Sequence, residues 1–564
     1  MSDAQFDAIV IGSGITGGWA AKELTEKGLR VLMLDRSPDV KHGEDYQGEH
    51  VPSWKLPFYG KEQRQLNDQE YFMSRHSGVL SAANRHLFNN DRDNPYQYDT
   101  TKPFHWIRGG AVGGRSLLWY RQCYRFSPAD FNANREDGHG SAWPISYEDI
   151  APWYDYVEDF IGVSGQAEGL AQLPDGKFLP PMQFYGIEKT VKKRIENKLP
   201  GVNMTIGRTA VLTENHRGRA ACHYCGPCER GCSSGSYFST QSSTLPAARA
   251  TGKLTLRADS VVERLEYDRD TKRISAVRVI DSKTGERLMF SAKLVFLCAS
   301  TIASTQILLN SSSDDFPNGM ANSSGVMGKY LMDHTTGIVA TAVFLDNLDN
   351  YYYGNRPNGF YIPRFRNNLD QDGDAEFIRG YGFQGNSTRP HWGDLANQKG
   401  FGKAYKDALS QPGNYWAIGL AGFGECLPNA NNRVTVDKAK LDRFGIPQVR
   451  VAMEWRQNEL KAREDMALQA QKIFRAAGAV FTVTNGELNN PGEGIHEMGT
   501  ARMGDNPRES VLNKWNQSHD IANLFVTDGS CMVSSSCVNP SLTYMALTAR
   551  ACDYAVTQLN KGLI

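Results

Sequence analysis

The sequence predicts an α/β protein, in which a Rossmann-like dinucleotide-binding domain carries an α+β domain built on an antiparallel sheet. Three observations indicate this class. An apolar run near the N-terminus leads into a glycine-rich turn, further strand-length runs alternate with helical segments, and residues 335–485 alternate polar with apolar and aromatic side chains. We therefore expect a discontinuous nucleotide-binding domain of residues 1–334 and 486–564, and a cap domain of residues 335–485.

The first glycine-rich turn, Gly12-Ser13-Gly14-Ile15-Thr16-Gly17, follows a short apolar strand and opens a helix. Gly12 permits the tight turn, Gly14 lets the backbone approach a pyrophosphate, and Gly17 lets the helix pack close to the strand. The N-terminus of the helix directs its N–H groups at the phosphates. Asp35 ends the next strand, where its carboxylate can bind ribose hydroxyls, which favours FAD or NAD over a cofactor with a 2′-phosphate. A purely structural glycine turn is the alternative.

Length and charge narrow the possible classes. A chain of 564 residues is too long for one ordinary core, so we expect at least two domains. The 62 basic residues balance the 62 acidic ones, which argues against a general nucleic-acid or membrane-surface role. No apolar run is long enough to span a bilayer, and the N-terminal residues show neither the basic region nor the apolar core of an export signal.

The remaining elements are predicted from apolar runs and helical periodicity. Residues 40–105 are polar and rich in aromatics, and we expect them to wrap the surface or to cover the cofactor. A second glycine-rich loop follows at residues 106–116. Strands are predicted at Leu254–Arg257, Val261–Tyr267, Ile274–Asp281 and Lys293–Cys298, and helices at Thr301–Leu309, Gln457–Ala476 and Ser541–Leu559.

Four separated motifs occur in order along the chain, at Gly12–Gly17, Gly109–Ser116, Ala299–Leu309 and His496–Leu547. In this combination the chain resembles the glucose–methanol–choline (GMC) oxidoreductases, a family that binds FAD. The C-terminal motif is the most specific of the four, because it joins His-Glu-Met-Gly-Thr-Ala-Arg-Met-Gly with Asp-Gly-Ser and Asn-Pro-Ser. The resemblance implies that His496 and Asn539 face the reactive N5 of the flavin.

Alcohol oxidation explains why these two residue types are needed. A neutral imidazole at His496 takes the hydroxyl proton while a hydride leaves the same carbon. The carboxamide of Asn539 cannot act as a base, and it orients the oxygen on which negative charge develops. The alternatives are a packed or surface histidine, and an asparagine that only forms a turn before Pro540.

The resemblance also implies contacts to the cofactor. Val262 would meet the adenine edge, and Asp528 and Gly529 the pyrophosphate or the ribityl chain, while Glu425 would orient a catalytic side chain. An ordinary strand valine and a solvated glutamate are the alternatives for Val262 and Glu425. Leu118 stands where family members with covalent FAD have a linking histidine, so we expect non-covalent FAD. The implied cofactor-binding residues are Gly12, Gly14, Gly17, Asp35, Gly110, Gly114, Ser116, Val262, Asp528, Gly529, Asn539 and Ser541.

Four of the ten cysteines, Cys222, Cys225, Cys228 and Cys232, form a C-x2-C-x2-C-x3-C run within residues 218–240. This spacing is used by bacterial iron–sulfur proteins. A structural zinc site and unliganded thiols are the alternatives. The chain is similar to a subset of bacterial sugar dehydrogenases that hold a three-iron, four-sulfur (3Fe–4S) cluster. That resemblance maps the cluster onto Cys222, Cys228 and Cys232 and leaves Cys225 as an extra thiol.

Together these patterns predict an FAD-dependent dehydrogenase that oxidises a hydroxyl of a sugar or glycoside and passes electrons out through the cluster. The chain most resembles the catalytic subunits of glucoside 3-dehydrogenases. That resemblance implies oxidation at C3, a small accessory subunit and a cytochrome c acceptor. It also implies a periplasmic location, which the chain would reach together with an exported partner. Cytoplasmic residence is the simpler interpretation of this chain alone. A flavin electron-transfer module and an oxygen-using oxidase with zinc are the competing hypotheses. Candidate hydroxyl-binding residues are Gln384, Asn386 and His391, for which solvated loop residues are the alternative.

Overall fold

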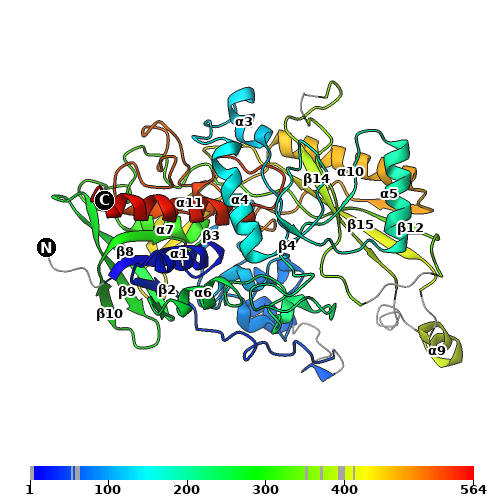
Figure 1. The fold of residues 1–564 in the computed structure, drawn as a ribbon, viewed down its shortest axis with the longest axis horizontal. Helices are drawn as coiled ribbons and strands as arrows, with labels where there is room; N and C mark the ends of the chain where they lie inside the picture. Colours follow the sequence, from blue (N-terminus) through cyan, green and yellow to red (C-terminus); the bar gives the residue numbers. More distant parts are fainter. Residues whose placement is uncertain are drawn as a thin grey trace.

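Two β-sheets at opposite ends of the molecule organise the protein (Figure 1). The computed structural model describes residues 6–52, 55–57, 64–349, 354–368, 372–390, 400–410 and 413–564. His391, one of the predicted hydroxyl-binding residues, lies outside the described residues. The C-terminus lies at the end of the molecule that holds the parallel sheet (Figure 1).

The first sheet has five strands, and every pair of neighbours is parallel. Its order is β19-β11-β1-β2-β7, so strands from the N-terminus, the middle and the C-terminus lie side by side. This topology confirms the predicted Rossmann-like class. The strands are β1 (Phe6–Ile11), β2 (Val31–Leu34), β7 (Leu254–Arg257), β11 (Ala292–Leu297) and β19 (Leu524–Val526).

Both faces of this sheet are covered, which explains the apolar runs in β1, β2, β11 and β19. Successive side chains of a strand point to opposite faces. Ala8 and Val10 share a core with α1 (Ile15–Glu26), α6 (Thr244–Ala250) and α11 (Ser541–Asn560), whereas Ile9 and Ile11 share another with the antiparallel meander β8-β9-β10. The meander strands are β8 (Ser260–Asp268), β9 (Arg273–Asp281) and β10 (Arg287–Phe290).

The second sheet has six antiparallel strands in the order β18-β12-β15-β14-β13-β6. Its apolar side chains form a separate core with α5 (Gly186–Lys198) and α10 (Gln457–Ala477). The predicted antiparallel cap sheet is therefore present. The strands are β6 (Thr205–Ile206), β12 (Ile338–Phe344), β13 (Phe360–Ile362), β14 (Tyr381–Thr388), β15 (Trp416–Gly424) and β18 (Phe481–Thr484).

Two segments cross the predicted domain boundaries at residues 334 and 485. Strand β6 and helix α5 come from the first half of the chain but complete the cap sheet and its core. Conversely β16 (Arg433–Leu441) pairs with β17 (Pro447–Ala452), which pairs with β3 (Gln97–Tyr98). The apolar side chains of β16 and β17 belong to the core of the parallel sheet. The two domains are interleaved rather than simply consecutive.

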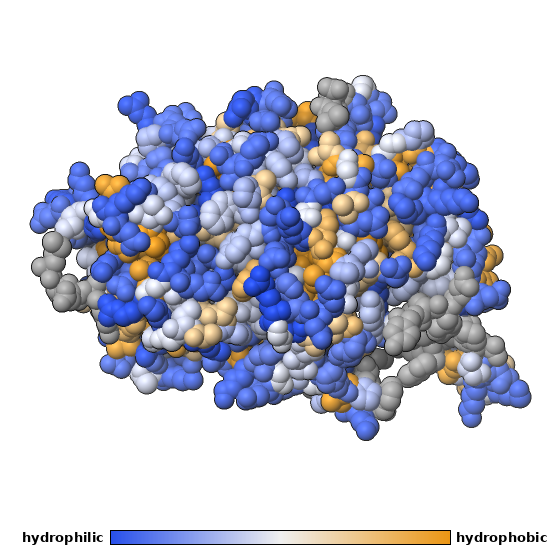
Figure 2. Space-filling model, viewed as in Figure 1, coloured by the Kyte–Doolittle hydropathy of each residue, from blue (hydrophilic) through white to orange (hydrophobic). Residues whose placement is uncertain are grey.

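The other elements connect or cover the sheets. Helix α4 packs against α11, and α9 stands away from the body of the protein (Figure 1). The face in Figure 2 is mostly hydrophilic, with apolar residues scattered over it. Among the described residues, no helix combines the length and hydropathy that a bilayer-crossing segment needs. The remaining elements are α2 (Arg64–Glu70), α3 (Pro128–Asp137), α4 (Tyr147–Ile161), α7 (Thr301–Asn310), α9 (Gly402–Ser410), β4 (Val163–Ser164), β5 (Phe178–Leu179) and short 3-10 turns that include η3 (Ser74–Ser77).

Candidate active site

A cavity of about 360 Å³ extends from the first glycine-rich turn to the antiparallel sheet. At one end it is lined by the β1–α1 turn and Asp35, and at the other by His496 and by Gln384 of β14. Chain segments that are hundreds of residues apart meet in its walls. The predicted residues that line it are Gly12, Gly14, Asp35, Gly114, Ser116, Gln384, His496, Asp528, Gly529, Asn539 and Ser541.

Four predicted residues do not line this cavity. Gly17 and Gly110 lie behind its wall, where a Cβ would come within 1.9 Å of the Gly12 carbonyl and 2.3 Å of the Phe88 carbonyl, so both positions need glycine for close backbone packing. Val262 lies in β8 and packs against the core of the parallel sheet. Asn386 is exposed, two residues beyond Gln384 on the same strand. The cofactor and substrate roles assigned to these four residues stay predictions.

The β1–α1 turn leaves open space where a cofactor phosphate would lie. A Cβ on Gly14 would meet no protein atom within 4 Å, whereas one on Gly17 would collide with the turn itself. Gly14 is also the N-cap residue of α1, so the positive end of that helix faces the opening. The turn is held by Asp35, whose carboxylate accepts hydrogen bonds from the backbone N–H and the hydroxyl of Ser13 at 3.0 and 2.5 Å. These residues fit a dinucleotide pyrophosphate.

At the opposite end of the cavity the side chains of His496, Asn539 and Gln384 form a chain of contacts. The Gln384 amide N–H donates to Asn539 Oδ1 at 2.5 Å, which directs Asn539 Nδ2 toward His496 Nε2 at 3.3 Å. The ring of Phe423 lies 6.1 Å from the His496 ring and covers it from the β15 side. The two residues of the C-terminal motif are therefore brought together, and their catalytic roles stay predictions.

His334 determines which nitrogen of His496 carries a proton. Its own Nε2 lies 3.1 and 2.8 Å from the carbonyl oxygens of Ser535 and Ser536, so Nε2 must donate and Nδ1 must be unprotonated. His334 Nδ1 lies 2.8 Å from His496 Nδ1, which must then be the donor. The lone pair of His496 is consequently on Nε2, facing Asn539 and the cavity.

Both imidazoles are held in the neutral form. Burial lowers the pKa of His334 to about 4, because the protonated ring loses its hydration. Burial, the neighbouring His334 and the Arg115 guanidinium all lower the pKa of His496 well below 6.5. A base with an unprotonated Nε2 is therefore available at neutral pH.

The segment that carries His496 is fixed by the buried Asp333. The Asp333 carboxylate accepts hydrogen bonds from the backbone N–H groups of Gly492, Gly494 and His496 at 2.9, 3.1 and 3.0 Å. Burial, together with the charge of Glu497, raises the pKa of Asp333 to about 7. Asp333 and His334 thus anchor the backbone and the ring of His496 from two adjacent positions.

The sequence did not indicate His334 or Asp333 as site residues. For Glu425 the expected partner was a catalytic side chain. Glu425 accepts hydrogen bonds from Arg379 and from the backbone N–H of Ser536, so it supports the loop that receives His334 rather than a catalytic side chain. The available signal was the polar pair Asp333-His334 directly after the apolar residues Leu331 and Met332. Leu118 lines the cavity, and its side chain offers no atom for a covalent flavin bond.

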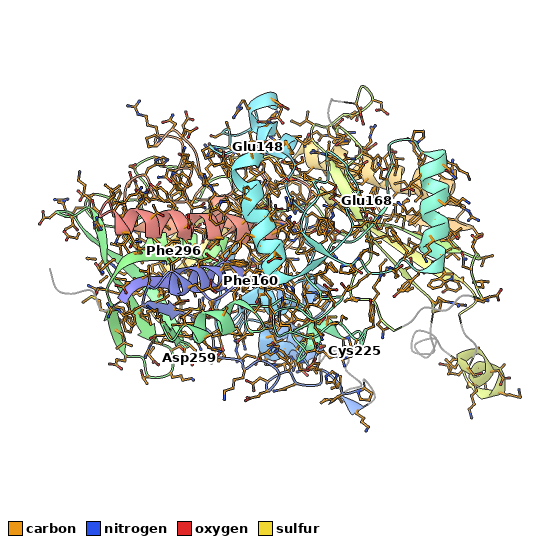
Figure 3. All side chains as sticks on the ribbon, in the orientation of Figure 1. Glu148, Phe160, Glu168, Cys225, Asp259 and Phe296 are labelled. Carbon is orange, nitrogen blue, oxygen red and sulfur yellow. The ribbon has the colours of Figure 1, made fainter. Side chains whose placement is uncertain are left out.

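The four motif cysteines line a second, much smaller cavity of about 20 Å³. Cys225 is exposed on a loop at the lower edge of the molecule, and the other three are partly buried (Figure 3). Burial raises the pKa of Cys228 to about 11, and the positive charge of Arg121 acts in the opposite direction. The ring of Tyr46 packs closely against this loop. A Cβ on Gly231 would come within 2.3 Å of that ring.

Comparison with known proteins places the chain in a family. Two family models described as GMC oxidoreductase match residues 6–336 and 428–548. The chain is a GMC oxidoreductase. Similar curated proteins include 2-methyl-1,2-propanediol dehydrogenase of Mycolicibacterium austroafricanum, which is 31% identical over 98% of this chain and 95% of that protein. The large subunit of fructose dehydrogenase of Gluconobacter japonicus is 27% identical over 99% of this chain and 98% of that protein.

The fold agrees with this assignment. The crystal structure of pyridoxine 4-oxidase from Mesorbium loti superposes with a TM-score of 0.60 at 14% identity, covering 98% of this chain and 99% of that one. GMC oxidoreductases bind FAD and act on the CH–OH groups of alcohols and sugars, and the glycine cradle, Asp35 and the elongated cavity fit that cofactor. This chain is therefore a flavoprotein oxidoreductase.

Substitutions of Gly14 and Gly17 should separate cofactor binding from folding. Gly14→Ala places a methyl group only in the open space of the turn, so the purified protein should lack FAD while the unfolding free energy of the apoprotein changes by less than about 1 kcal/mol. Gly17→Ala should cost about 2–3 kcal/mol of stability, because its Cβ collides with the backbone. FAD absorbance and thermal unfolding of the apoproteins measure both effects. Normal FAD content in Gly14→Ala would show that the pyrophosphate lies elsewhere.

Substitutions of His334 test the tautomer argument. His334→Phe removes the acceptor for His496 Nδ1–H, and we expect the rate of substrate-dependent flavin reduction to fall by about 10- to 100-fold with little change in KM, by analogy with a histidine held in the wrong tautomer. His334→Gln keeps an acceptor and a donor at similar positions and should recover most of the rate. Equal losses in both variants would contradict a role in setting the tautomer.

Proposed function

We propose that this protein is an FAD-dependent dehydrogenase that oxidises a ring hydroxyl of a sugar or glycoside, at C3, and releases electrons through an iron–sulfur cluster. One observation supports the chemistry above all others. The unprotonated Nε2 of His496 and the amide of Asn539 lie together at the end of the cavity that suits FAD. The residues placed to hold the cofactor are Gly12, Gly14, Asp35, Gly114, Ser116, Asp528, Gly529 and Ser541.

The chemical step divides between the chain and its cofactor. FAD, when bound, accepts the hydride from the substrate carbon. His496 accepts the hydroxyl proton at Nε2, and its Nδ1–H keeps the hydrogen bond to His334 throughout. Asn539 Nδ2–H donates to the same substrate oxygen, because Gln384 already occupies the amide oxygen of Asn539. The two groups stabilise the negative charge that develops on that oxygen.

The substrate end of the cavity combines one aromatic face with amide groups. Phe423 offers a ring for the apolar face of a sugar, and Gln384 offers an amide group beside Asn539. The names of similar proteins include a fructose dehydrogenase subunit and a propanediol dehydrogenase, so both sugars and small diols belong in a substrate screen. We favour a sugar because the chain resembles the glucoside 3-dehydrogenases. The C3 assignment depends on the same resemblance.

The proposed cluster rests on the spacing of the four cysteines in the sequence, and zinc and unliganded thiols are the alternatives. Zn–S bonds of about 2.3 Å hold any two sulfurs of one zinc site within about 4.6 Å of each other. Within the described part of the chain, the cysteine sulfurs form no group of three whose members all lie within 4.8 Å. A cluster of several irons would hold its ligands further apart than zinc does, and metal analysis decides between a cluster, zinc and unliganded thiols.

Arg121 links the two cavities. It lines the cofactor cavity, and its guanidinium lies 4.8 Å from the ring centre of Tyr237, which lines the cysteine cavity. Tyr237 in turn donates a hydrogen bond to the Leu117 carbonyl, next to Leu118 in the cofactor cavity wall. This contact and this hydrogen bond connect the walls of the two cavities, which supports the proposed electron exit.

The partners follow from the same proposal. Single electrons from the cluster would pass to a cytochrome c, and a small accessory subunit would accompany the catalytic chain to the periplasm. The similar fructose dehydrogenase protein is itself named as a large subunit, which supports a multi-subunit arrangement. An oxygen-using oxidase with zinc at the cysteines, a flavin electron-transfer module and a cytoplasmic location are the competing possibilities.

Anaerobic mixing tests the proposed chemistry. Purified holoenzyme is mixed with a panel of glycosides, free sugars and 1,2-diols while flavin absorbance is followed, and product analysis identifies the oxidised carbon. His496→Ala should slow flavin reduction by about 10²–10⁴-fold, the usual contribution of a general base. Because the pKa of His496 is well below 6.5, protonation of His496 itself should not slow the reaction as the pH decreases to 6.5.

His139→Ala is the matched control for this experiment, because His139 is an exposed histidine that lines neither cavity. It should keep the wild-type rate. Flavin reduction that survives in His496→Ala would eliminate the assigned base. Reduction by diols alone would replace the sugar by a smaller substrate.

Two cysteine variants test the electron exit. Cys228→Ser should lose iron and cytochrome reduction, while sugar-dependent flavin reduction stays within about twofold, since the cluster acts after hydride transfer. Cys225→Ser should keep its iron if three cysteines hold a 3Fe–4S cluster. Metal analysis, electron paramagnetic resonance and stopped-flow absorbance supply the readouts. Bound zinc, or hydrogen peroxide formation without an added acceptor, would instead support the oxidase.

A further inference from the structure

Three side chains outside the proposed redox centre converge at one point on the cavity rim. They are His76 of η3, His105 and Glu493, and one ligand atom from each lies within 4.8 Å of the other two. His105 Nδ1 is 2.7 Å and His76 Nδ1 is 3.7 Å from the same oxygen, Oε1 of Glu493. The two imidazole rings are stacked, with centroids 3.9 Å apart and planes 28° apart, so both Nδ1 atoms face the carboxylate.

These residues come from three chain segments far apart in sequence, so no single local element forces them together. His105 is also fixed by its backbone, whose N–H donates to the Pro491 carbonyl at 2.8 Å. Within the described residues, the ion pairs of Glu493 involve only His76 and His105, and its further contact is the Asn490 amide at 3.4 Å. A partly buried carboxylate thus faces two imidazole nitrogens and no lysine or arginine.

We infer that His76, His105 and Glu493 form a binding site for a divalent metal ion of the zinc type. Two imidazole nitrogens and one carboxylate oxygen are a donor set that zinc and its neighbouring first-row metals favour. Tetrahedral bonds of about 2.1 Å place donor atoms about 3.4 Å apart. The measured separations of 2.7 and 3.7 Å lie on either side of that value, so small side-chain movements suffice.

The exposure of the site allows an ion to enter. The His76 side chain is 30% exposed, whereas that of His105 is 11% exposed, so the ion reaches the site from the His76 side and a solvent molecule completes its coordination.

This metal site would connect to the proposed redox centre through one short segment. Glu493 lies three residues before His496, and both line the cofactor cavity, as does Ser77 next to His76. Asp333 holds the backbone of residues 492–496 from one side, and the metal would tie Glu493 to η3 and to His105 from the other. The ion would stiffen this wall of the cavity without touching the reacting atoms.

Zinc titration of the purified, metal-depleted holoenzyme tests the site, with isothermal calorimetry for affinity and stoichiometry and thermal unfolding for the linked stabilisation. The test variants are His76→Ala, which changes a partly exposed side chain, and Glu493→Gln, which keeps the shape and removes the charge. His139→Ala is the matched control, because His139 is an exposed histidine elsewhere. FAD content and circular dichroism verify that each variant is folded.

We expect the wild type and His139→Ala to bind one zinc ion that raises their unfolding temperature. Both test variants should bind that ion at least about 100-fold more weakly and lose the temperature shift, since removing even an outer partner of a metal site costs 10- to 100-fold. Identical zinc binding by the wild type and both test variants would place the ion elsewhere and overturn the inference. So would the absence of zinc binding to the wild type.

Discussion

The hydrogen bonds from His334 to the carbonyls of Ser535 and Ser536 are the constraint on which the rest of the active site depends. They set which ring nitrogen of His334 carries the proton, and His334 in turn sets which nitrogen of His496 does. The Nε2 lone pair of His496 therefore faces the cavity. Backbone carbonyls cannot ionise or rotate, so this control is insensitive to pH in a way that a carboxylate partner would not be. The lowered pKa values of both rings are consistent with the same buried, uncharged surroundings.

Other parts of the structure support this arrangement. The carbonyls lie in the loop that Glu425 and Arg379 hold from the cap side, and the backbone around His496 is held by Asp333. Gln384 fixes the orientation of the Asn539 amide from a third direction. Each reactive group is therefore positioned by a partner from a different chain segment, which is how a site can be held rigid before any ligand binds.

The sequence predicted the elements whose signals are local. These elements are the glycine turn, Asp35, the parallel strands and the helices at 457–477 and 541–560. Each depends on neighbours within a few residues, so a local pattern was enough to predict it. His334 was not predictable, since its significance depends on contacts 162 and 202 residues away. The same reason explains β6 and the β16–β17 pair. Strand β6 has only 2 residues, and nothing local in β16 or β17 indicates the sheet that they join.

The interleaving of the two domains has a consequence for how the chain can be divided. A cut between them at residue 334 would leave the cap sheet without its edge strand β6 and without α5, and would leave the β3 edge unpaired on the other fragment. Neither piece would retain a complete core, so neither should fold alone. The substrate-binding half of this protein therefore cannot be exchanged between relatives as a simple cassette, and a functional chimera needs at least four crossover points.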